Sequence, residues 1–354
     1  MSELFDNDAH DYDAVLIVSF GGPEGPDDVR PFLDNVLKGL NIPPPVKARI
    51  AERYDRFGGI SPINAETRKF IEALKAELAA HGPKLPVYWG NRNWHPLLPD
   101  TLRRMADDGV KSAIAYVTST FSSYSGCRKY REDLYEAVQG LENPPHIDKL
   151  RASYNHPGFI KAVAERVREA LERAPAARDD GTLLFTAHSL PLSMAKRTHY
   201  QAQLQDACSL VSQELGIDSW KLVYQSNNAS YGEPWLEPDI ADALEAVKEA
   251  GQIDVVVVPI GFVCDHMEVV LDLDIEAKEK ADALGLRMVR AGTVDDHPAY
   301  VTMVRDLIVE RMAAEPERRW LGTRGPTADY CAPNCCLSGK PGDPKPALCG
   351  AETQ

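Results

Sequence analysis

Short apolar runs rich in β-branched residues recur along the chain, and each is followed by glycine, proline or polar residues. Such runs are typical of buried strands that end at turns. They predict strands at residues 14–19, 85–90, 113–117, 183–186, 221–224 and 255–260. Segments with apolar residues at helical spacing lie between them, most clearly at residues 65–80. This alternation predicts an α/β fold with parallel, doubly wound, Rossmann-like sheets.

A repeated motif indicates that the second half of the chain is built like the first. His156-Pro157 and His297-Pro298 each open a segment with the same pattern of aromatic and apolar residues. We therefore expect two similar domains, residues 11–150 and 151–290, with a ligand cleft between them. Residues 291–320 are expected to form a C-terminal helix that packs back on the N-terminal lobe, and residues 321–354 a cysteine-rich extension.

The stretch from Asp254 to Glu276 most clearly indicates a functional site. Its apolar run leads into Cys264-Asp265-His266-Met267-Glu268, and open α/β sheets bind ligands at the carboxyl ends of their strands. His266 and Glu268 are two positions apart, so their side chains point the same way if the chain is extended there. Together they could hold one cation.

Acidic residues continue beyond this point at helical spacing. Glu268, Asp272 and Glu276 recur every four residues, which aligns three carboxylates along one helix face. A solvated face is the ordinary interpretation of Asp272 and Glu276. The alternative is an acidic file that leads to the site.

His188 is the expected partner of Glu268. It follows the predicted strand at 183–186, and it would face His266 and Glu268 if the two halves pack with their strand ends opposed. An imidazole and a carboxylate around an open position suit Fe²⁺ or Zn²⁺. A purely structural hydrogen bond is the alternative for a single histidine.

Composition narrows the class of protein. The chain has 354 residues, 44% of them hydrophobic and 26% charged, which is typical of a globular protein with two domains. A net charge of −14 disfavours nucleic acid and anionic lipid as partners. No apolar run is long enough for a transmembrane segment. An acidic N-terminus and an odd number of cysteines, seven, favour a cytoplasmic location without a disulfide framework.

Residues 29–59 combine basic and apolar side chains in this otherwise acidic chain. An amphipathic helix with solvated lysine and arginine is the ordinary interpretation. The functional alternative is a lip that receives a flat apolar ligand carrying carboxylates. The preceding Gly21-Gly22-Pro23 lacks the glycine spacing of a dinucleotide-binding loop.

The C-terminal extension is rich in cysteine, proline and glycine. Its cysteines are Cys331, Cys335, Cys336 and Cys349. This composition fits either a disordered thiol-rich end or a site for Zn²⁺ or an iron–sulfur cluster. Adjacent Cys335 and Cys336 rarely both serve one site, so the extension offers three ligands.

Six motifs stand out when the chain is taken as a whole. They are Ser19-Phe-Gly-Gly-Pro23, Gly58-Gly-Ile-Ser-Pro62, residues 88–96, Thr186-Ala-His-Ser-Leu-Pro191, Gln225-Ser with Pro234-Trp-Leu-x-Pro238, and Pro259-Ile-Gly-Phe-Val-Cys-Asp-His-Met-Glu268. In this order they resemble the ferrochelatases over roughly residues 13–315. Phe-Gly-Gly-Pro-Glu-Gly, Gly-Asn-Arg-Asn-Trp and the cysteine-bearing tail are similar to the actinobacterial type that acts on coproporphyrin III.

The resemblance implies a lyase that inserts Fe²⁺ into coproporphyrin III in heme b biosynthesis, with transient handover to the neighbouring enzymes of that pathway. It implies that His188 and Glu268 are the catalytic, iron-side pair and that His266 supports them. It also implies that Asp272 and Glu276 form an acidic path for the metal.

The resemblance also implies how the porphyrin and a cofactor are held. Ser61, Tyr130 and, less specifically, Lys38 would bind propionates. Phe20 stands where some relatives have a tyrosine that ligates the product iron, so stacking is expected there instead. A [2Fe–2S] cluster would be bound by one internal cysteine and three from the extension, namely Cys127, Cys331, Cys336 and Cys349, with Cys335 in reserve.

Two alternatives remain at this point. One is a related chelatase that acts on protoporphyrin IX or places cobalt in a sirohydrochlorin-type ring. The other is a non-catalytic tetrapyrrole or iron carrier with an iron–sulfur sensor. The possible acid–base pair His188 and Glu268 disfavours the carrier, which needs no proton acceptor.

Overall fold

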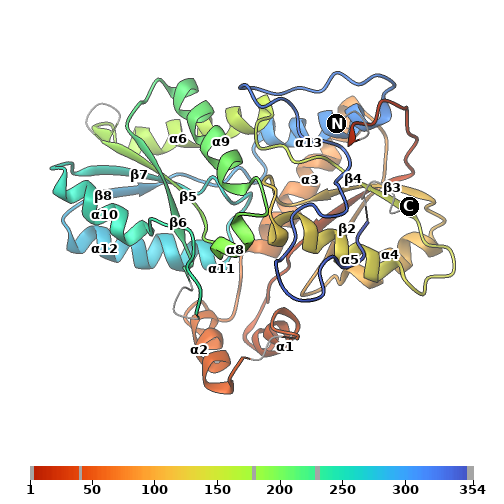
Figure 1. The fold of residues 1–354 in the computed structure, drawn as a ribbon, viewed down its shortest axis with the longest axis horizontal. Coiled ribbons are helices and arrows are strands. Elements are labelled where there is room, and N and C mark those ends of the chain that lie inside the picture. The colour runs from red at the N-terminus through yellow and green to blue at the C-terminus, as the bar shows by residue number, and fades with distance from the viewer. Residues whose placement is uncertain (1–3, 40–41, 178–180, 228–231, 349–354) are drawn as a thin grey trace.

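Two four-stranded parallel sheets form the centre of the structure, which is a computed structural model that describes residues 4–39, 42–177, 181–227 and 232–348 (Figure 1). The N-terminal sheet has the order β2-β1-β3-β4 and the C-terminal sheet the order β6-β5-β7-β8, so the two have equivalent topologies. The strands are β1 (Ala14–Ser19), β2 (Val87–Asn91), β3 (Ser112–Val117), β4 (His146–Lys149), β5 (Thr182–His188), β6 (Trp220–Gln225), β7 (Asp254–Val258) and β8 (Arg287–Arg290). The predicted α/β class with two parallel sheets is confirmed.

Burial explains which strands the sequence revealed. The central strands β1 and β7 are buried along their whole length, so an unbroken apolar run marks them. The edge strands β4 and β8 have the sequences HIDK and RMVR, and no strand was predicted there. A short edge strand needs few apolar residues because one side of it has no neighbouring strand.

Helices cover both sheets (Figure 1). In the N-terminal lobe they are α3 (Ile63–His81), α4 (Leu98–Asp107) and α5 (Lys129–Val138). In the C-terminal lobe they are α6 (Pro157–Arg173), α8 (Leu192–Ala195), α9 (Tyr200–Leu215), α10 (Ile240–Glu249), α11 (Met267–Val269) and α12 (Lys278–Ala283). Two π-helical turns, η2 (Tyr124–Arg128) and η4 (Val270–Ala277), precede α5 and α12.

The last helix of the described chain, α13 (Pro298–Met312), lies against both lobes. It packs on α3 of the N-terminal lobe and on α6 of the C-terminal lobe. The two His-Pro motifs begin α6 and α13, where Nδ1 of His156 and of His297 each accepts a backbone N–H two residues on. This is an N-cap hydrogen bond made by imidazole in place of the usual hydroxyl or carboxyl oxygen.

Residues 26–39 and 42–55 form a projection below the two lobes (Figure 1). It consists of α1 (Pro26–Val36) and α2 (Pro44–Asp55). Phe32 packs edge-to-face on Tyr54 and Trp94, which holds the two helices against the N-terminal lobe. Arg49, Arg53 and Arg56 are exposed, so the basic side chains predicted for this lip face solvent.

The extension runs along the N-terminal lobe near α5 (Figure 1). Arg128 donates to the carbonyl oxygens of Pro333 and Lys345, and Arg131 donates to that of Leu348. Residues 321–348 are thus attached to the lobe, in contrast to the alternative of a disordered end. In the described part of the chain we find no helix that combines the length and apolar character needed to span a membrane.

Candidate active site

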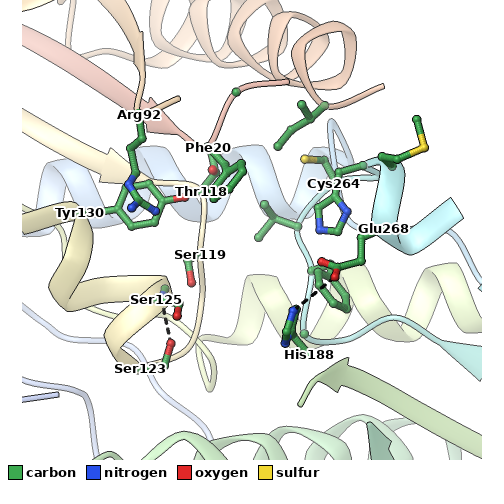
Figure 2. A pocket seen from close by; sticks show the side chains of 18 of the residues that line it. Phe20, Arg92, Thr118, Ser119, Ser123, Ser125, Tyr130, His188, Cys264 and Glu268 are labelled. Carbon is green, nitrogen blue, oxygen red and sulfur yellow. Dashed lines mark hydrogen bonds and ion pairs between the residues drawn. The ribbon is translucent and has the colours of Figure 1, made fainter. Parts of the chain in front are cut away.

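A cavity of about 360 Å³ lies between the carboxyl ends of the two sheets. Phe20 follows β1, Thr118 and Ser119 follow β3, and His188 ends β5. The C-terminal lobe adds the loop from Gly261 to Glu268 after β7. Figure 2 shows His188, Cys264 and Glu268 on one side of the cavity and Arg92, Tyr130 and several serines on the other. The cavity therefore has one wall from each lobe.

His188 and Glu268 form an ion pair at the C-terminal wall. The Nε2 atom of His188 lies 3.5 Å from Oε1 of Glu268, and the side chains are 34% and 41% exposed, so a ligand can reach both. Nδ1 of His188 lies 2.5 Å from the carbonyl oxygen of Ser189. That carbonyl can only accept, so Nδ1 carries a proton and Nε2 is the atom presented to a ligand.

Electrostatics favour the charged form of this pair. Burial lowers the pKa of His188, but the charge and hydrogen bond of Glu268, the Ser189 carbonyl and the charge of Asp272 together outweigh burial and raise this pKa to about 9. Burial raises the pKa of Glu268, but the charge and hydrogen bond of His188, with smaller contributions from His266 and Ser226, together outweigh burial and hold that pKa below its usual range. Without a metal the pair is imidazolium and carboxylate. A cation that binds both must displace the imidazole proton.

His266 lines the same cavity. Its backbone is extended, but the next residue begins α11, so Glu268 lies in the first helical turn. The condition for His266 and Glu268 to point the same way, an extended chain through residues 266–268, is therefore not met. Nδ1 of His266 accepts the N–H of Val269. Burial lowers the pKa of His266, so a neutral imidazole lies beside Glu268.

Asp272 is buried, which corrects its interpretation as part of a solvated face. One of its oxygens accepts hydrogen bonds from Gln225 and Ser226 at the end of β6. Burial, followed by the charge of Glu268, raises the pKa of Asp272 to about 6. Glu276 is exposed. The charges of both Glu268 and Glu276 act on Asp272, and residues 270–277 form a π-helical turn where an α-helix was expected. The acidic path itself stays a prediction.

The opposite wall contains three of the four predicted porphyrin contacts, Phe20, Ser61 and Tyr130. Ser61 also joins the lobes, because its hydroxyl oxygen accepts the N–H of Met267. Lys38 is exposed and is not among the cavity-lining residues. The structure therefore does not bring Lys38 together with the other three.

Sequence reasoning missed several polar residues of this wall. The Arg92 guanidinium lies 4.4 Å from the centre of the Tyr130 ring and 5.5 Å from that of Phe20, and it is paired with Asp133. Ser119, Ser123 and Ser125 place their side chains around the same space (Figure 2). The motif Gly-Asn-Arg-Asn-Trp was the available signal for Arg92. The serines lie on a loop, where no periodic pattern identifies the inward-facing residues.

The extension brings cysteines to Cys127 on η2. Cys127 is hydrogen-bonded to Cys331, and this contact, together with burial, raises its pKa. Cys335 contacts Cys331, and its Sγ lies 3.4 Å from that of Cys336. Cys349 lies outside the described residues. Within the described residues, no group of three or more His, Cys, Asp or Glu side chains is already arranged to hold a metal ion.

The ferrochelatase family model matches residues 12–312 of this chain. The chain belongs to the ferrochelatase family. It is 47% identical to a ferrochelatase from Rhodopirellula baltica, in an alignment that covers 92% of this chain and 93% of that protein. It is 45% identical to the coproporphyrin III ferrochelatase of Streptomyces coelicolor over 98% of both chains. This ferrochelatase is thus aligned with relatives along almost their full length.

Solved structures of other chelatases share the fold of this ferrochelatase. SirB from Bacillus subtilis with Fe³⁺ matches with a TM-score of 0.53 at 11% identity, covering 83% of this chain and 94% of that one. A Deinococcus radiodurans protein with structural similarity to chelatases matches with a TM-score of 0.51 at 18% identity, over 86% of this chain and 57% of that one. At these identities the likeness shows the fold alone.

Proposed function

We propose that this ferrochelatase inserts Fe²⁺ into coproporphyrin III to give Fe-coproporphyrin III. The observation that carries the proposal is the placement of His188 and Glu268 across a cavity from Phe20, Arg92 and Tyr130. One wall offers a metal ligand and a base, and the other offers aromatic and cationic groups. Relatives named coproporphyrin III ferrochelatase, at 41–47% identity, support the choice of porphyrin.

The reaction requires that two pyrrole N–H protons leave the ring while Fe²⁺ exchanges water for four nitrogens. Glu268 is held ionised by His188, so it can bind the incoming cation without first losing a proton. Binding of that cation favours loss of the Nε2 proton of His188, which frees the imidazole to ligate the metal or to accept a pyrrole proton. Asp272, with its pKa raised to about 6, can pass protons or cations towards Glu276 and solvent.

Residues of the cavity wall from the N-terminal lobe would orient the porphyrin. The face of Phe20 can stack on the ring, as expected where the axial tyrosine of some relatives is missing. The hydroxyls of Ser61 and Tyr130 are candidates for propionate contacts, and Arg92 supplies a positive charge beside Tyr130. The basic lip at residues 29–59, including exposed Lys38, would attract the four carboxylates of coproporphyrin III before they enter.

Turnover on two porphyrins tests the choice of substrate. We expect faster iron insertion into coproporphyrin III than into protoporphyrin IX at equal concentration and low salt, because the latter has two carboxylates fewer to interact with the basic lip. Added salt should reduce the difference between the two rates, because it screens the attraction between the carboxylates and the basic lip. Faster metallation of protoporphyrin IX would contradict the proposed substrate and leave the ferrochelatase activity standing. A wild-type rate in both His188→Ala and Glu268→Gln would contradict the assigned chemistry.

A [2Fe–2S] cluster held by Cys127, Cys331, Cys336 and Cys349, with Cys335 as the alternative to Cys336, completes the proposal. The contacts of Cys331 with Cys127 of η2 and with Cys335 support this proposal, and Sγ of Cys336 lies 3.4 Å from that of Cys335. Lys149 and Arg131 act on Cys127 electrostatically and would offset thiolate charge. Bound there, the cluster would supply a covalent link between extension and lobe and a one-electron redox centre.

Anaerobic purification tests the cluster. We expect a reddish-brown protein with iron and acid-labile sulfide in equal amounts, and their loss in Cys127→Ser. Cys208→Ser is the matched control, since Cys208 is a buried thiol of α9. Comparison of Cys335→Ser with Cys336→Ser identifies the third ligand. Colourless anaerobic protein would contradict the assignment.

We further propose a cytoplasmic location and direct handover of porphyrin from the preceding enzyme and of product to the following one in heme b biosynthesis. The net charge of −14 supports this location, because it disfavours retention on anionic membranes. Cell fractionation tests the first point. A product-transfer rate that is unchanged by a competing heme scavenger tests the second.

A further inference from the structure

The π-helical turn η2 has two functional faces. Ser123, Ser125 and Gly126 line the cavity, where Figure 2 shows the two serines. The next two residues, Cys127 and Arg128, contact the extension. The turn is packed closely against the cavity wall, since a Cβ added to Gly126 would lie 2.6 Å from the Ser119 hydroxyl oxygen. A shift of the turn on one face must therefore change the other.

Arg128 connects this turn to two separate segments of the extension. Its guanidinium donates to the carbonyl oxygens of Pro333 at 2.6 Å and of Lys345 at 2.5 Å. The residue is only 2% exposed, so water does not compete with these bonds. A planar guanidinium can bind two carbonyls and one carboxylate at once, which lysine cannot do in the same geometry.

The third partner of Arg128 leads back to the start of the turn. Nε of Arg128 donates to one oxygen of Glu132 at 3.1 Å, and the other oxygen of Glu132 accepts the Tyr124 hydroxyl at 3.1 Å. Tyr124 is the first residue of η2, and the preceding Ser123 accepts the N–H of Gly126. The extension, Arg128, Glu132 and Tyr124 thus form one continuous, partly buried network that ends next to Ser123 and Ser125 of the cavity wall.

We propose that Arg128 is a positioning residue through which the cysteine-rich extension holds Ser123, Ser125 and Gly126 in the shape that binds the porphyrin. The iron-side residues His188 and Glu268 lie on the opposite wall and are not part of this network. The extension therefore controls affinity for the porphyrin and leaves iron binding unchanged. The inference deepens the proposed function and rests on it, because it takes the ligand of this wall to be a porphyrin.

The network also gives the proposed cluster a role in substrate binding. Cys127 lies between Gly126 of the cavity wall and Arg128 of the network. Ligation of Cys127 together with cysteines of the extension would reinforce the same attachment. The effect requires no electron transfer, so oxidised and reduced protein should bind porphyrin alike.

The test compares Arg128→Gln, Arg128→Lys and Tyr124→Phe in the full-length protein, with Arg103→Gln as control because Arg103 is an exposed residue of α4. Coproporphyrin III affinity is measured by fluorescence quenching, and KM for each substrate by initial rates. Loss of one buried charge-assisted hydrogen bond corresponds to a change of about tenfold. We expect Arg128→Gln to raise the porphyrin Kd and KM by about tenfold, Arg128→Lys by less, and Arg103→Gln not at all. The KM for iron and kcat should stay within about twofold.

Hydrogen exchange separates positioning from general destabilisation. Arg128→Gln should increase exchange both in residues 123–127 and in residues 333–345, whereas Tyr124→Phe should increase it in residues 123–127 alone, because its side chain lies at the far end of the network. If both variants are folded, and the wild type binds porphyrin but the variants bind it equally well, the inference is overturned. A wild type that binds no porphyrin would instead overturn the proposed function.

Discussion

The imidazole Nε2 of His188 and the carboxylate Oε1 of Glu268 lie 3.5 Å apart. His188 ends β5 and Glu268 lies in the segment after β7, so eighty positions separate them in the sequence. Each group changes the protonation of the other. The carboxylate raises the pKa of the imidazole against the effect of burial, and the imidazolium keeps the carboxylate ionised. Their contact therefore determines which of them carries a proton before iron arrives.

Glu268→Gln should separate the effect of the Glu268 charge on the pKa of His188 from the effect of burial. With a neutral amide at position 268, burial acts on His188 with less opposition, so its pKa should fall from about 9 towards or below its usual value. Titration of the His188 ring by NMR measures the shift. Iron insertion should fall by about 100-fold, as expected when an acid–base group is removed. Glu279→Gln, on the exposed side of α12, is the control and should leave both quantities unchanged.

Asp272→Asn should weaken iron uptake selectively. Burial and the charge of Glu268 raise the pKa of Asp272 to about 6, so this carboxyl is ionised above that pH and becomes neutral as the pH falls below it. For the wild type we expect kcat/KM for iron to decline as the pH falls from 7 to 5. In the variant this decline should be smaller, because asparagine does not titrate. At pH 7.5 its KM for iron should rise about tenfold, with an unchanged KM for porphyrin. Asp282→Asn on α12 is the matched control; an equal effect there would refute a specific path.

Phe20→Tyr should introduce an axial oxygen for the product. Phe20 is the first residue after β1, and it lines the same cavity as His188. A phenol oxygen at this position could ligate ferric coproheme, shift its absorption bands and slow its dissociation by about tenfold. Phe20→Leu removes the stacking surface without adding oxygen. It should weaken porphyrin binding and leave the absorption bands of bound product unchanged.

His156 should make the stability of the fold depend on pH. Burial, and then the charges of Arg151 and Arg319, lowers the pKa of His156 to about 3, compared with 6.5 for the free side chain. The unfolded chain binds a proton at this site below pH 6.5 and the folded chain does not, so acid favours unfolding. The contribution is fully present above pH ~6.5 and is lost at up to about 1.4 kcal/mol per pH unit as the pH falls towards ~3. Urea denaturation between pH 7.5 and pH 5 measures it.

His156→Asn is the variant for this measurement, because asparagine keeps an N-cap acceptor for α6 but does not titrate. The difference in unfolding free energy between wild type and variant should shrink or change sign as the pH falls. Gln139 is exposed and does not titrate, so Gln139→Asn should give a difference that is constant with pH. A constant difference for His156→Asn as well would show that His156 is solvated in the folded protein.

The sheets and the iron-side pair His188 and Glu268 could both be predicted from the same sequence signal. Buried parallel strands require apolar runs, and polar residues such as His188 and Glu268 are conspicuous directly after them. Serines 119, 123 and 125 and Arg92 escaped prediction because the conformation of a loop decides which side chains face inward. The π-helical turn at residues 270–277 escaped because its hydrogen-bond pattern comes from tertiary packing and has no distinct sequence period.

Biosynthesis of the chain is constrained by α13. This helix, the final one in the described residues, wedges between α3 and α6, and its Tyr300 hydroxyl is hydrogen-bonded to Tyr116 of β3. Each sheet can form as it leaves the ribosome. The helix that contacts both lobes, α13, is synthesised after all strands of both sheets. A nascent or prematurely terminated chain without α13 thus lacks the packing that joins α3 of one lobe to α6 of the other.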